Sequence, residues 1–268
     1  MGAAGAGIEI RGTTQIVGVW GWPVRHSASP PMHNAAFAAL GMDWAYVPFA
    51  VAPERIGEAV AGIRALGLRG VNVTVPLKEL VLPFLDALTP RAARLGAVNT
   101  ILNEEGYLTG DSTDGRGFLA ALAESDALPP PGSRAIVLGA GGSARAVIAA
   151  LRESGVSVTV ANRSLERAHE LAARFHSASD GPLIEVISLE EAALGRALGR
   201  EGAVLLVNTT SVGMHPRDAE MPPLPLETLH PDLFVSDLIY NPPQTRLLAA
   251  AEARGCRTQN GLSMLVWQ

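Results

Sequence analysis

The chain of 268 residues is long enough for one large domain or two of ordinary size, and its 48% of hydrophobic residues excludes a predominantly disordered protein. The net charge of −5 comes without any basic block, which argues against nucleic acid as a partner, and no apolar run approaches the ~20 residues that cross a membrane. The single cysteine, Cys256, excludes an internal disulfide and fits a reducing cytoplasm. We therefore expect a cytoplasmic protein, monomer or homodimer, that acts on a small molecule.

The first 110 residues alternate short apolar strands with helical segments, which predicts a small α/β unit. Ser29 before Pro30 and Thr89 before Pro90 each indicate an N-cap followed by proline at the first helical position. The expected strands are 15–20, 44–50, 70–75 and a hairpin of 100–104 with 107–109, and the expected helices are 30–40, 55–66 and two that begin at 77 and 90.

Polar side chains gather where the strands of this unit end. Ser27 and Ser29 stand at a helix start, and Asn72, Thr74 and Asn99 stand at strand ends. Ligands of open α/β sheets bind outside the carboxyl ends of the strands, so these groups suit a small, heavily hydroxylated anion. The alternatives are that Ser29 only caps its helix, which is compatible with ligand contact, and that the two asparagines form turns.

Two residues of this region could handle a proton. Lys78 follows the strand that ends at Val75-Pro76, and Asp114 follows the hairpin. A lysine in a partly desolvated cleft can act as acid or base near neutral pH, and a nearby carboxylate would orient it and bind a substrate hydroxyl. The alternative is that Lys78 is a solvated helix residue, paired with Glu79 or with nothing.

A strand, a glycine turn and a helix follow one another in the middle of the chain. Residues 135–138 suit a buried parallel strand, three glycines between 139 and 142 form the turn, and the helix that follows ends at Gly155, a left-handed cap. This geometry presents backbone N–H groups and a positive helix end to phosphate. An ordinary strand-to-helix turn is the alternative, because a glycine trio alone is a weak signal.

The next strand, residues 156–161, ends in Asn162-Arg163-Ser164. An NAD-binding unit places an acidic residue here to hold the ribose 2′-hydroxyl, and this chain has none. Arg163 can instead bind a 2′-phosphate in bidentate fashion, with Arg167 one helical turn further on. We therefore predict NADP as the cofactor; the alternative is that both arginines belong to a solvated face.

The rest of the chain continues the alternation, which predicts a parallel, doubly wound sheet. A helix at 114–128 joins the two halves, and Ser188 with Glu191 indicates a capping box for a helix at 189–198. The six histidines show no metal-ligand spacing, so we expect no metal. The remaining expected elements are strands at 184–187, 203–207 and 233–237 and a helix at 245–253.

Together these motifs resemble the shikimate dehydrogenase family, over about residues 15–268. Five segments carry the resemblance: 21–30 (GWPVRHSASP) with His33-Asn34, 72–79 (NVTVPLKE), 96–100 (GAVNT), 111–115 (DSTDG) and 261–268 (GLSMLVWQ). The glycine turn, Asn162-Arg163-Ser164 and residues 208–211 (NTTS) add the cofactor side.

The resemblance implies an α/β protein of two domains. A three-layer α/β substrate-binding and catalytic domain would span 1–113, with 261–268 returning to it, and a Rossmann-like NADP-binding domain would span 114–260. The implied reaction is the reversible, NADPH-linked reduction of 3-dehydroshikimate to shikimate in aromatic amino acid biosynthesis.

The resemblance also implies a role for individual residues. Lys78 and Asp114 would be the catalytic pair, and Ser27 and Ser29 would bind the substrate carboxylate. The other substrate-binding residues would be Asn72, Thr74, Asn99 and Gln268 around the ring hydroxyls, together with Lys78 and Asp114, with Tyr240 nearby. The cofactor-binding residues would be Gly139, Ala140, Gly141, Gly142, Ser143, Asn162, Arg163, Ser164, Arg167, Thr210 and Gly261.

Two departures from the family pattern are visible. Ser112 occupies a position that is usually Asn, and family members usually continue for a helix or two beyond the position of Gln268. Three other functions stay open: a quinate/shikimate or aminoshikimate dehydrogenase, a catalytically silent NADP/shikimate-binding sensor, and an enzyme like methylene-tetrahydrofolate dehydrogenase. Lys78 and Asp114 argue against the sensor, and the last enzyme would not need the Ser27/Ser29 pair.

Overall fold

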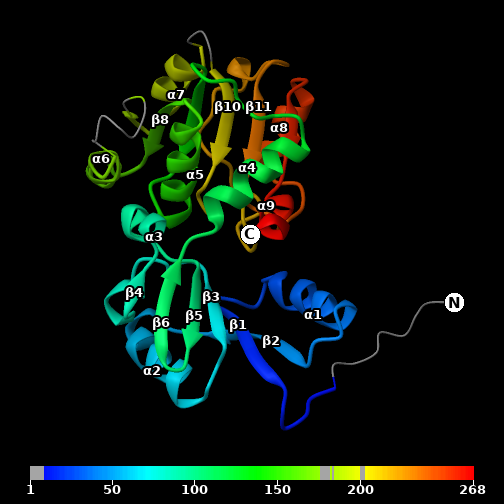
Figure 1. The fold of residues 1–268 in the computed structure, drawn as a ribbon. Helices are drawn as coiled ribbons and strands as arrows, with labels where there is room; N and C mark the ends of the chain where they lie inside the picture. The colour runs from blue at the N-terminus through cyan, green and yellow to red at the C-terminus, as the bar shows by residue number, and fades with distance from the viewer. Residues whose placement is uncertain (1–8, 176–181, 183, 200–202) are drawn as a thin grey trace, which may run out of the picture. The chain divides into compact units, whose positions relative to one another are not determined.

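The computed structural model describes residues 9–175, 182, 184–199 and 203–268, and these form two compact units that divide between Ser112 and Thr113 (Figure 1). Each unit is built on its own six-stranded sheet. Within the described residues, no helix has the length and apolar character needed to span a bilayer.

The sheet of the first unit is mixed, with the order β2-β1-β3-β5-β6-β4. β1 pairs parallel with both β2 and β3, whereas β5 runs antiparallel to β3 and to β6. The predicted hairpin is therefore confirmed as β5 and β6. The strands are β1 (Gln15–Gly21), β2 (Trp44–Ala50), β3 (Gly70–Val73), β4 (Ala87–Leu88), β5 (Thr100–Glu104) and β6 (Tyr107–Asp111).

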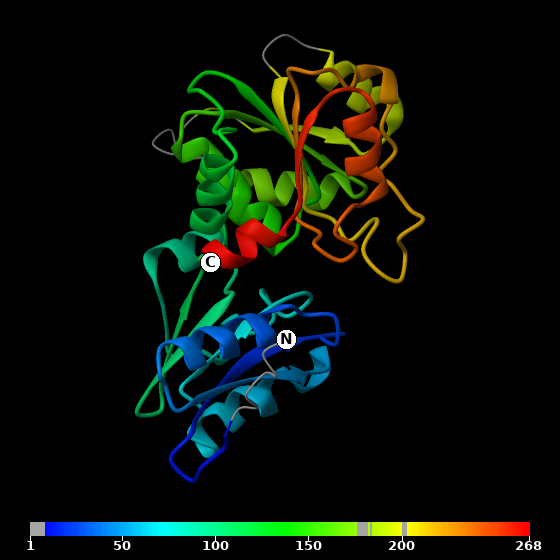
Figure 2. The same cartoon turned by 90° about the vertical axis from the view of Figure 1, so that its right-hand side faces the viewer.

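Successive side chains of β1 point to opposite faces of the sheet. Both faces carry apolar residues, and a helix packs on each. Val17 and Val19 pack with Tyr46 on the side of α1 (Ser29–Ala39), and Trp20 packs with Val60 on the side of α2 (Ile56–Ala65). Figure 2 shows the two helices on opposite sides of the sheet. The expected three-layer α/β arrangement is confirmed.

The two predicted proline-assisted helix starts turn out differently. Thr89 caps α3 (Pro90–Leu95), since its Oγ1 accepts a hydrogen bond of 3.3 Å from Ala92 N. Ser29 does not cap α1: it is the first helical residue, and Ala28 holds the cap position.

The helix predicted from residue 77 is wrong. Residues 75–81 form turns, followed by a short 3₁₀ helix, η2 (Leu82–Phe84). Pro83 supplies the physical reason, because a proline lacks the N–H that a continuing helix needs and its ring crowds the preceding turn. The segment that carries Lys78 is therefore an irregular loop. A second 3₁₀ turn, η1 (Pro53–Arg55), precedes α2.

The second unit has an entirely parallel sheet with the order β12-β11-β10-β7-β8-β9. This is the strand order of the dinucleotide-binding Rossmann fold, whose crevice opens where the order reverses, here between β7 and β10. The strands are β7 (Arg134–Leu138), β8 (Ser157–Asn162), β9 (Ile184–Ser188), β10 (Ala203–Asn208), β11 (Phe234–Asp237) and β12 (Arg257–Gln259). The helices are α4 (Asp114–Glu124), α5 (Gly142–Glu153), α6 (Leu165–Ala173), α7 (Glu191–Leu198), α8 (Arg246–Ala253) and α9 (Leu262–Trp267), with a 3₁₀ turn, η4 (Leu226–Thr228), before β11.

Helix ends in this unit give mixed outcomes. Gly155 follows α5 with a φ of +78°, as a left-handed cap requires. The capping box at Ser188 and Glu191 is wrong, because Glu190 is the N-cap and the Ser188 hydroxyl donates to its carboxylate instead. β12 and α9 were not expected from the sequence.

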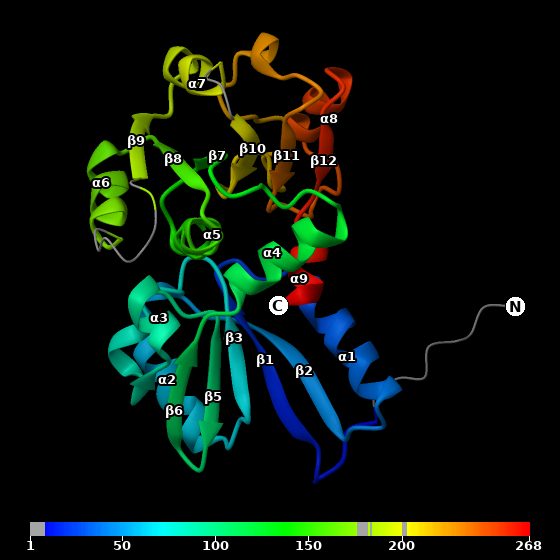
Figure 3. The same cartoon turned by 45° about the horizontal axis from the view of Figure 1, so that its top comes forward.

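The end of the chain packs against α4. The Trp267 indole donates a hydrogen bond of 3.2 Å to the Glu124 carboxylate, which also accepts from the Ser263 hydroxyl. Figure 3 shows α4 and α9 side by side. Residues 261–268 therefore lie with the second unit, whereas the sequence predicts that they return to the first.

Candidate functional site

In the first unit, the expected site residues lie at one edge of the sheet. β1 and β3 are parallel and end at the same edge, and β5 begins there because it runs antiparallel to β3. Backbone hydrogen bonds join the segments: Val73 N donates to Asn99 O at 2.8 Å, and Thr74 N donates to Trp20 O at 2.8 Å. Asn72, Thr74 and Asn99 are thus brought together by the sheet itself.

Lys78 belongs to the same cluster. Its carbonyl accepts a hydrogen bond of 2.9 Å from Val98 N, one residue before Asn99. The residue is only 9% exposed, and Leu77 and Val81 beside it are wholly buried. A solvated helix position is therefore excluded for Lys78, which is held beside polar groups at the edge of a hydrophobic core.

Ser27 and Ser29 form a second polar group in this unit. Ser29 N donates to Ser27 Oγ at 3.3 Å, and Ser29 is buried in the first turn of α1. The alternative that Ser29 serves as an N-cap is removed, since Ala28 holds that position. The segment from Ser27 to the start of α1 follows the carboxyl end of β1, so both serines extend the edge that carries Asn72.

In the second unit, the glycine turn lies at the point where the strand order reverses. Gly139 has a φ of +108°, and a Cβ built on it would meet Oγ1 of Thr209 at 2.7 Å and Cγ2 of Thr210 at 3.1 Å. Thr209 Oγ1 also donates to the Leu138 carbonyl at 2.6 Å. A Cβ on Gly141 would instead meet nothing within 4 Å. The turn is therefore packed at Gly139 and open at Gly141. It contains Ala140 and leads through Gly142 and Ser143 into α5.

The two arginines follow β8: Arg163 comes directly after its last residue, and Arg167 lies in the first turn of α6. Asn162 Nδ2 donates to Ser164 O at 2.8 Å, and Ser164 caps α6 by accepting from Arg167 N at 3.3 Å. The side chains of Arg163 and Arg167 are exposed, and neither guanidinium has a hydrogen-bond or acidic partner within the described part of the chain. Both remain available to a phosphate.

A buried polar network beneath the reversal point was missed by the sequence analysis. Asn208 and Asp237 end neighbouring strands in register, and Asn208 Nδ2 donates to Asp237 Oδ1 at 3.0 Å. Asp237 Oδ2 accepts from the Thr245 hydroxyl at 2.7 Å, and Asn208 Oδ1 accepts from Thr210 N and Oγ1. Burial raises the pKa of Asp237 to about 6. A polar residue at the end of each of two buried strands was the signal that could have revealed this network.

The remaining expected residues lie at α4, α9 and the end of β11. Asp114 begins α4 and is 2% exposed, and the Gln268 side chain lies against Gly117, one turn further along that helix. Gly261 N donates to Ile239 O at 3.1 Å, next to Tyr240. The second unit therefore gathers Asp114 with Gln268, and Gly261 with Tyr240. Lys78 belongs to the first unit and Asp114 to the second.

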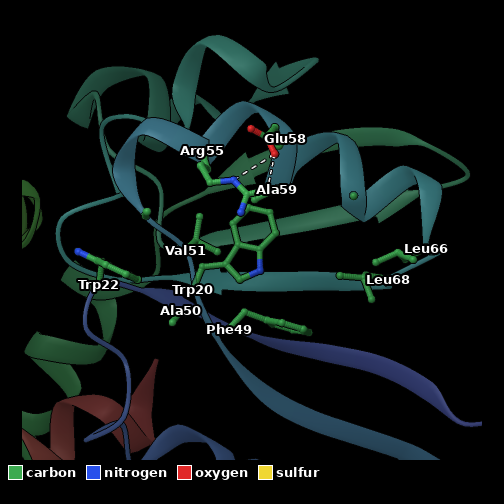
Figure 4. Close-up of a pocket in the computed structure, with 12 residues that line it drawn as sticks. Trp20, Trp22, Phe49, Ala50, Val51, Arg55, Glu58, Ala59, Leu66 and Leu68 are labelled. Carbon is green, nitrogen blue, oxygen red and sulfur yellow. Dashed lines mark hydrogen bonds and ion pairs between the residues drawn. The ribbon is translucent and has the colours of Figure 1, made fainter.

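Two hollows open on the first unit, one on each face of its sheet. A cavity of about 240 Å³ on the α1 side is bordered by His33, Tyr46, Asn72 and Thr100 among others. A larger apolar hollow of about 440 Å³ lies on the α2 side, where Figure 4 shows Trp20 near the Arg55–Glu58 ion pair, with Phe49 on the other side of Trp20. Only the first of these borders a residue of the expected site. Across the described residues, no group of three His, Cys, Asp or Glu side chains is placed to hold a metal ion.

Two family models match this chain, one in the first unit and one in the second. A family model described as the shikimate dehydrogenase substrate binding domain matches residues 19–101, and a model described as shikimate / quinate 5-dehydrogenase matches residues 121–194. The shikimate dehydrogenase (NADP(+)) of Moorella thermoacetica is 50% identical over 262 residues, which cover 97% of this chain and 87% of that protein. The chain belongs to the shikimate dehydrogenase family.

Solved structures of shikimate dehydrogenases agree with this assignment. One in complex with NADP+ superposes with a TM-score of 0.89 at 37% identity, over 98% of this chain and 89% of the other. The Listeria monocytogenes shikimate 5-dehydrogenase, in complex with shikimate and NAD, gives a TM-score of 0.85 at 38% identity, over 96% and 90% of the two chains. The family membership sets aside an enzyme like methylene-tetrahydrofolate dehydrogenase.

Proposed function

We propose that this chain catalyses the reversible reduction of 3-dehydroshikimate to shikimate with NADPH. The observation that carries the proposal is the buried Lys78, whose main chain is joined to Val98 at the sheet edge that also carries Asn72, Thr74 and Asn99. A ring with several hydroxyls can form a hydrogen bond with each of these groups. A ligand without those hydroxyls would lose these bonds, at about 0.5–1.5 kcal/mol each.

The second unit offers a fitting place for NADP. The open side of the turn at Gly141 admits a pyrophosphate beside the first turn of α5, where backbone N–H groups point outward. The exposed guanidinium groups of Arg163 and Arg167 provide the positive charge for a 2′-phosphate. When bound, NADPH supplies a hydride to the substrate carbonyl carbon.

The protein's own residues would manage the proton and the orientation of the substrate. Lys78 would donate a proton to the carbonyl oxygen during reduction and take it back during oxidation. Asp114 would accept a hydrogen bond from a ring hydroxyl. Ser27 and Ser29 would donate to the substrate carboxylate, and Gln268 and Tyr240 would bind at the ring.

The test is a spectrophotometric assay of the purified chain, in which absorbance of the reduced nicotinamide is followed with shikimate or quinate and with NADP or NAD. Turnover with shikimate and NADP, at a kcat/KM at least tenfold above the other three pairs, is the expected result. A preference for quinate or for NAD would instead assign the chain to the quinate/shikimate dehydrogenases of the family. NADP binding without turnover of either substrate would contradict the proposal and favour a silent sensor.

A further inference from the structure

Helix α1 holds Tyr46 in place from two directions. The Asn34 side chain accepts from Tyr46 N and donates to Tyr46 O, both at 2.8 Å, so its amide replaces the strand partner that the edge strand β2 lacks on that side. The neighbouring His33 ring stacks on the Tyr46 ring at a centroid distance of 4.2 Å and an angle of 9°. Tyr46 is only 3% exposed. A buried phenol with a fixed backbone and a stacked ring has little freedom to move.

The Tyr46 hydroxyl contacts the side chain of Asn72. It donates a hydrogen bond of 2.7 Å to Asn72 Oδ1. The direction of this bond follows from the other end of the amide, where Asn72 Nδ2 donates to the main-chain carbonyl of Asn99 at 3.3 Å. A carbonyl oxygen only accepts, so the nitrogen of the Asn72 amide must face it and the oxygen must face Tyr46.

The hydrogen bonds continue from Asn72 to a second amide of the expected site. Asn72 Nδ2 also donates to Thr100 Oγ1 at 3.2 Å, and the Thr100 hydroxyl donates to Asn99 Oδ1 at 2.9 Å. Tyr46, Asn72 and Thr100 thus each donate to a defined acceptor, and the series ends at Asn99 Oδ1. Both hydrogens of the Asn72 amide are engaged inside the protein, which leaves the second lone pair of Oδ1 to accept from a ligand hydroxyl.

We propose that Tyr46 is a positioning residue for substrate binding: its hydroxyl fixes the Asn72 amide so that Oδ1 accepts from a substrate hydroxyl, and Thr100 passes this orientation to Asn99. The inference rests on the proposed function, in which Asn72 and Asn99 contact the substrate. The cavity of about 240 Å³ beside Tyr46 and Asn72 gives the amide room to turn once the phenol oxygen is removed.

The test is Tyr46→Phe, which keeps the ring and its stacking and removes one oxygen. We expect the KM for shikimate to rise roughly 3- to 10-fold, the range that corresponds to one lost hydrogen bond, while the KM for NADP and kcat change by less than about twofold. Tyr107→Phe is the matched control, because Tyr107 is 55% exposed on β6 and has no part in the series. A variant that partly unfolds lowers the apparent kcat but not the KM, so a fold defect cannot imitate the expected result.

A double-mutant cycle with Asn72→Ala separates positioning from a merely structural role. If Tyr46 acts through Asn72, the double variant has the same KM for shikimate as Asn72→Ala alone. Multiplicative effects in the cycle, or an unchanged KM in Tyr46→Phe, would overturn the inference. Absence of shikimate turnover by the wild-type chain would instead refute the proposed function, so the two failures are distinguishable.

Discussion

A Cβ atom on Gly139 would lie 2.7 Å from Oγ1 of Thr209. The turn after β7 therefore lies so close to the residues after β10 that no side chain fits between them. This is the point where the strand order of the second sheet reverses. The φ of +108° at Gly139 is a second reason that only glycine fits there. Gly141, two residues on, is extended and faces open space.

This difference predicts opposite phenotypes for two alanine variants of one turn. Gly139→Ala should lower the midpoint of thermal unfolding by several degrees, since a strained φ and an overpacked contact each cost about 1–3 kcal/mol. Gly141→Ala should keep the wild-type midpoint but weaken NADP binding about tenfold or more, because its Cβ occupies the proposed pyrophosphate position. Differential scanning fluorimetry and a fluorescence titration with NADP measure the two effects. Equal loss of stability in both variants would contradict this interpretation of the turn.

Lys78→Met tests the proposed proton donor with a side chain of similar length and no charge. We expect kcat to fall by at least about 10²-fold, the usual contribution of a positioned acid or base. The dissociation constant for NADP should stay within about twofold of the wild-type value, because Lys78 lies in the first unit and the proposed cofactor residues lie in the second. Normal turnover by this variant would remove Lys78 from the mechanism.

Arg163→Ala tests the origin of the cofactor preference. The exposed guanidinium at the tip of β8 is proposed to bind the 2′-phosphate, which NAD lacks. We therefore expect the KM for NADP to rise about tenfold or more and the KM for NAD to change little. Arg174→Ala, an exposed arginine at the other end of α6, is the control and should leave both values unchanged. An equal rise for NAD and NADP would show that Arg163 does not read the 2′-phosphate.

The sequence predicts those features of the fold that depend on local chemistry. Thr89 caps α3 as expected, and Gly155 ends α5, because a hydroxyl before proline and a glycine after a helix act within a few residues. The residues at the strand ends, such as Asn72 and Thr74, could be predicted as a group because parallel neighbours end at one edge.

The failures come from contacts distant in the sequence or from competing local choices. Ser29 enters α1 instead of capping it, and Ser188 bonds Glu190 instead of a backbone N–H. The Tyr46–Asn72 and Asn208–Asp237 hydrogen bonds each join residues more than twenty positions apart. No periodicity encodes such pairs, because they depend on strand register, which only the folded sheet sets.

Asp237 predicts a pH dependence of stability. Burial raises its pKa from the usual 3.8 to about 6, so the folded state keeps a proton that the unfolded state loses between about pH 4 and pH 6. The stabilisation from this group is therefore complete below about pH 4 and is lost as the pH rises through about 6. A shift of about two pKa units corresponds to about 3 kcal/mol in the free energy of unfolding.

Asp237→Asn removes this titration while keeping a polar group of the same shape, whose Nδ2 can donate to the Thr245 hydroxyl. The free energy of unfolding of the variant, measured by urea denaturation and compared with wild type, should gain up to about 3 kcal/mol between pH 4 and pH 7. Taking the difference cancels the contributions of all other groups, and Asp232→Asn, at an exposed aspartate, serves as the control. Parallel pH profiles for Asp237→Asn and wild type would mean that the Asn208 and Thr245 hydrogen bonds to Asp237 offset its burial completely.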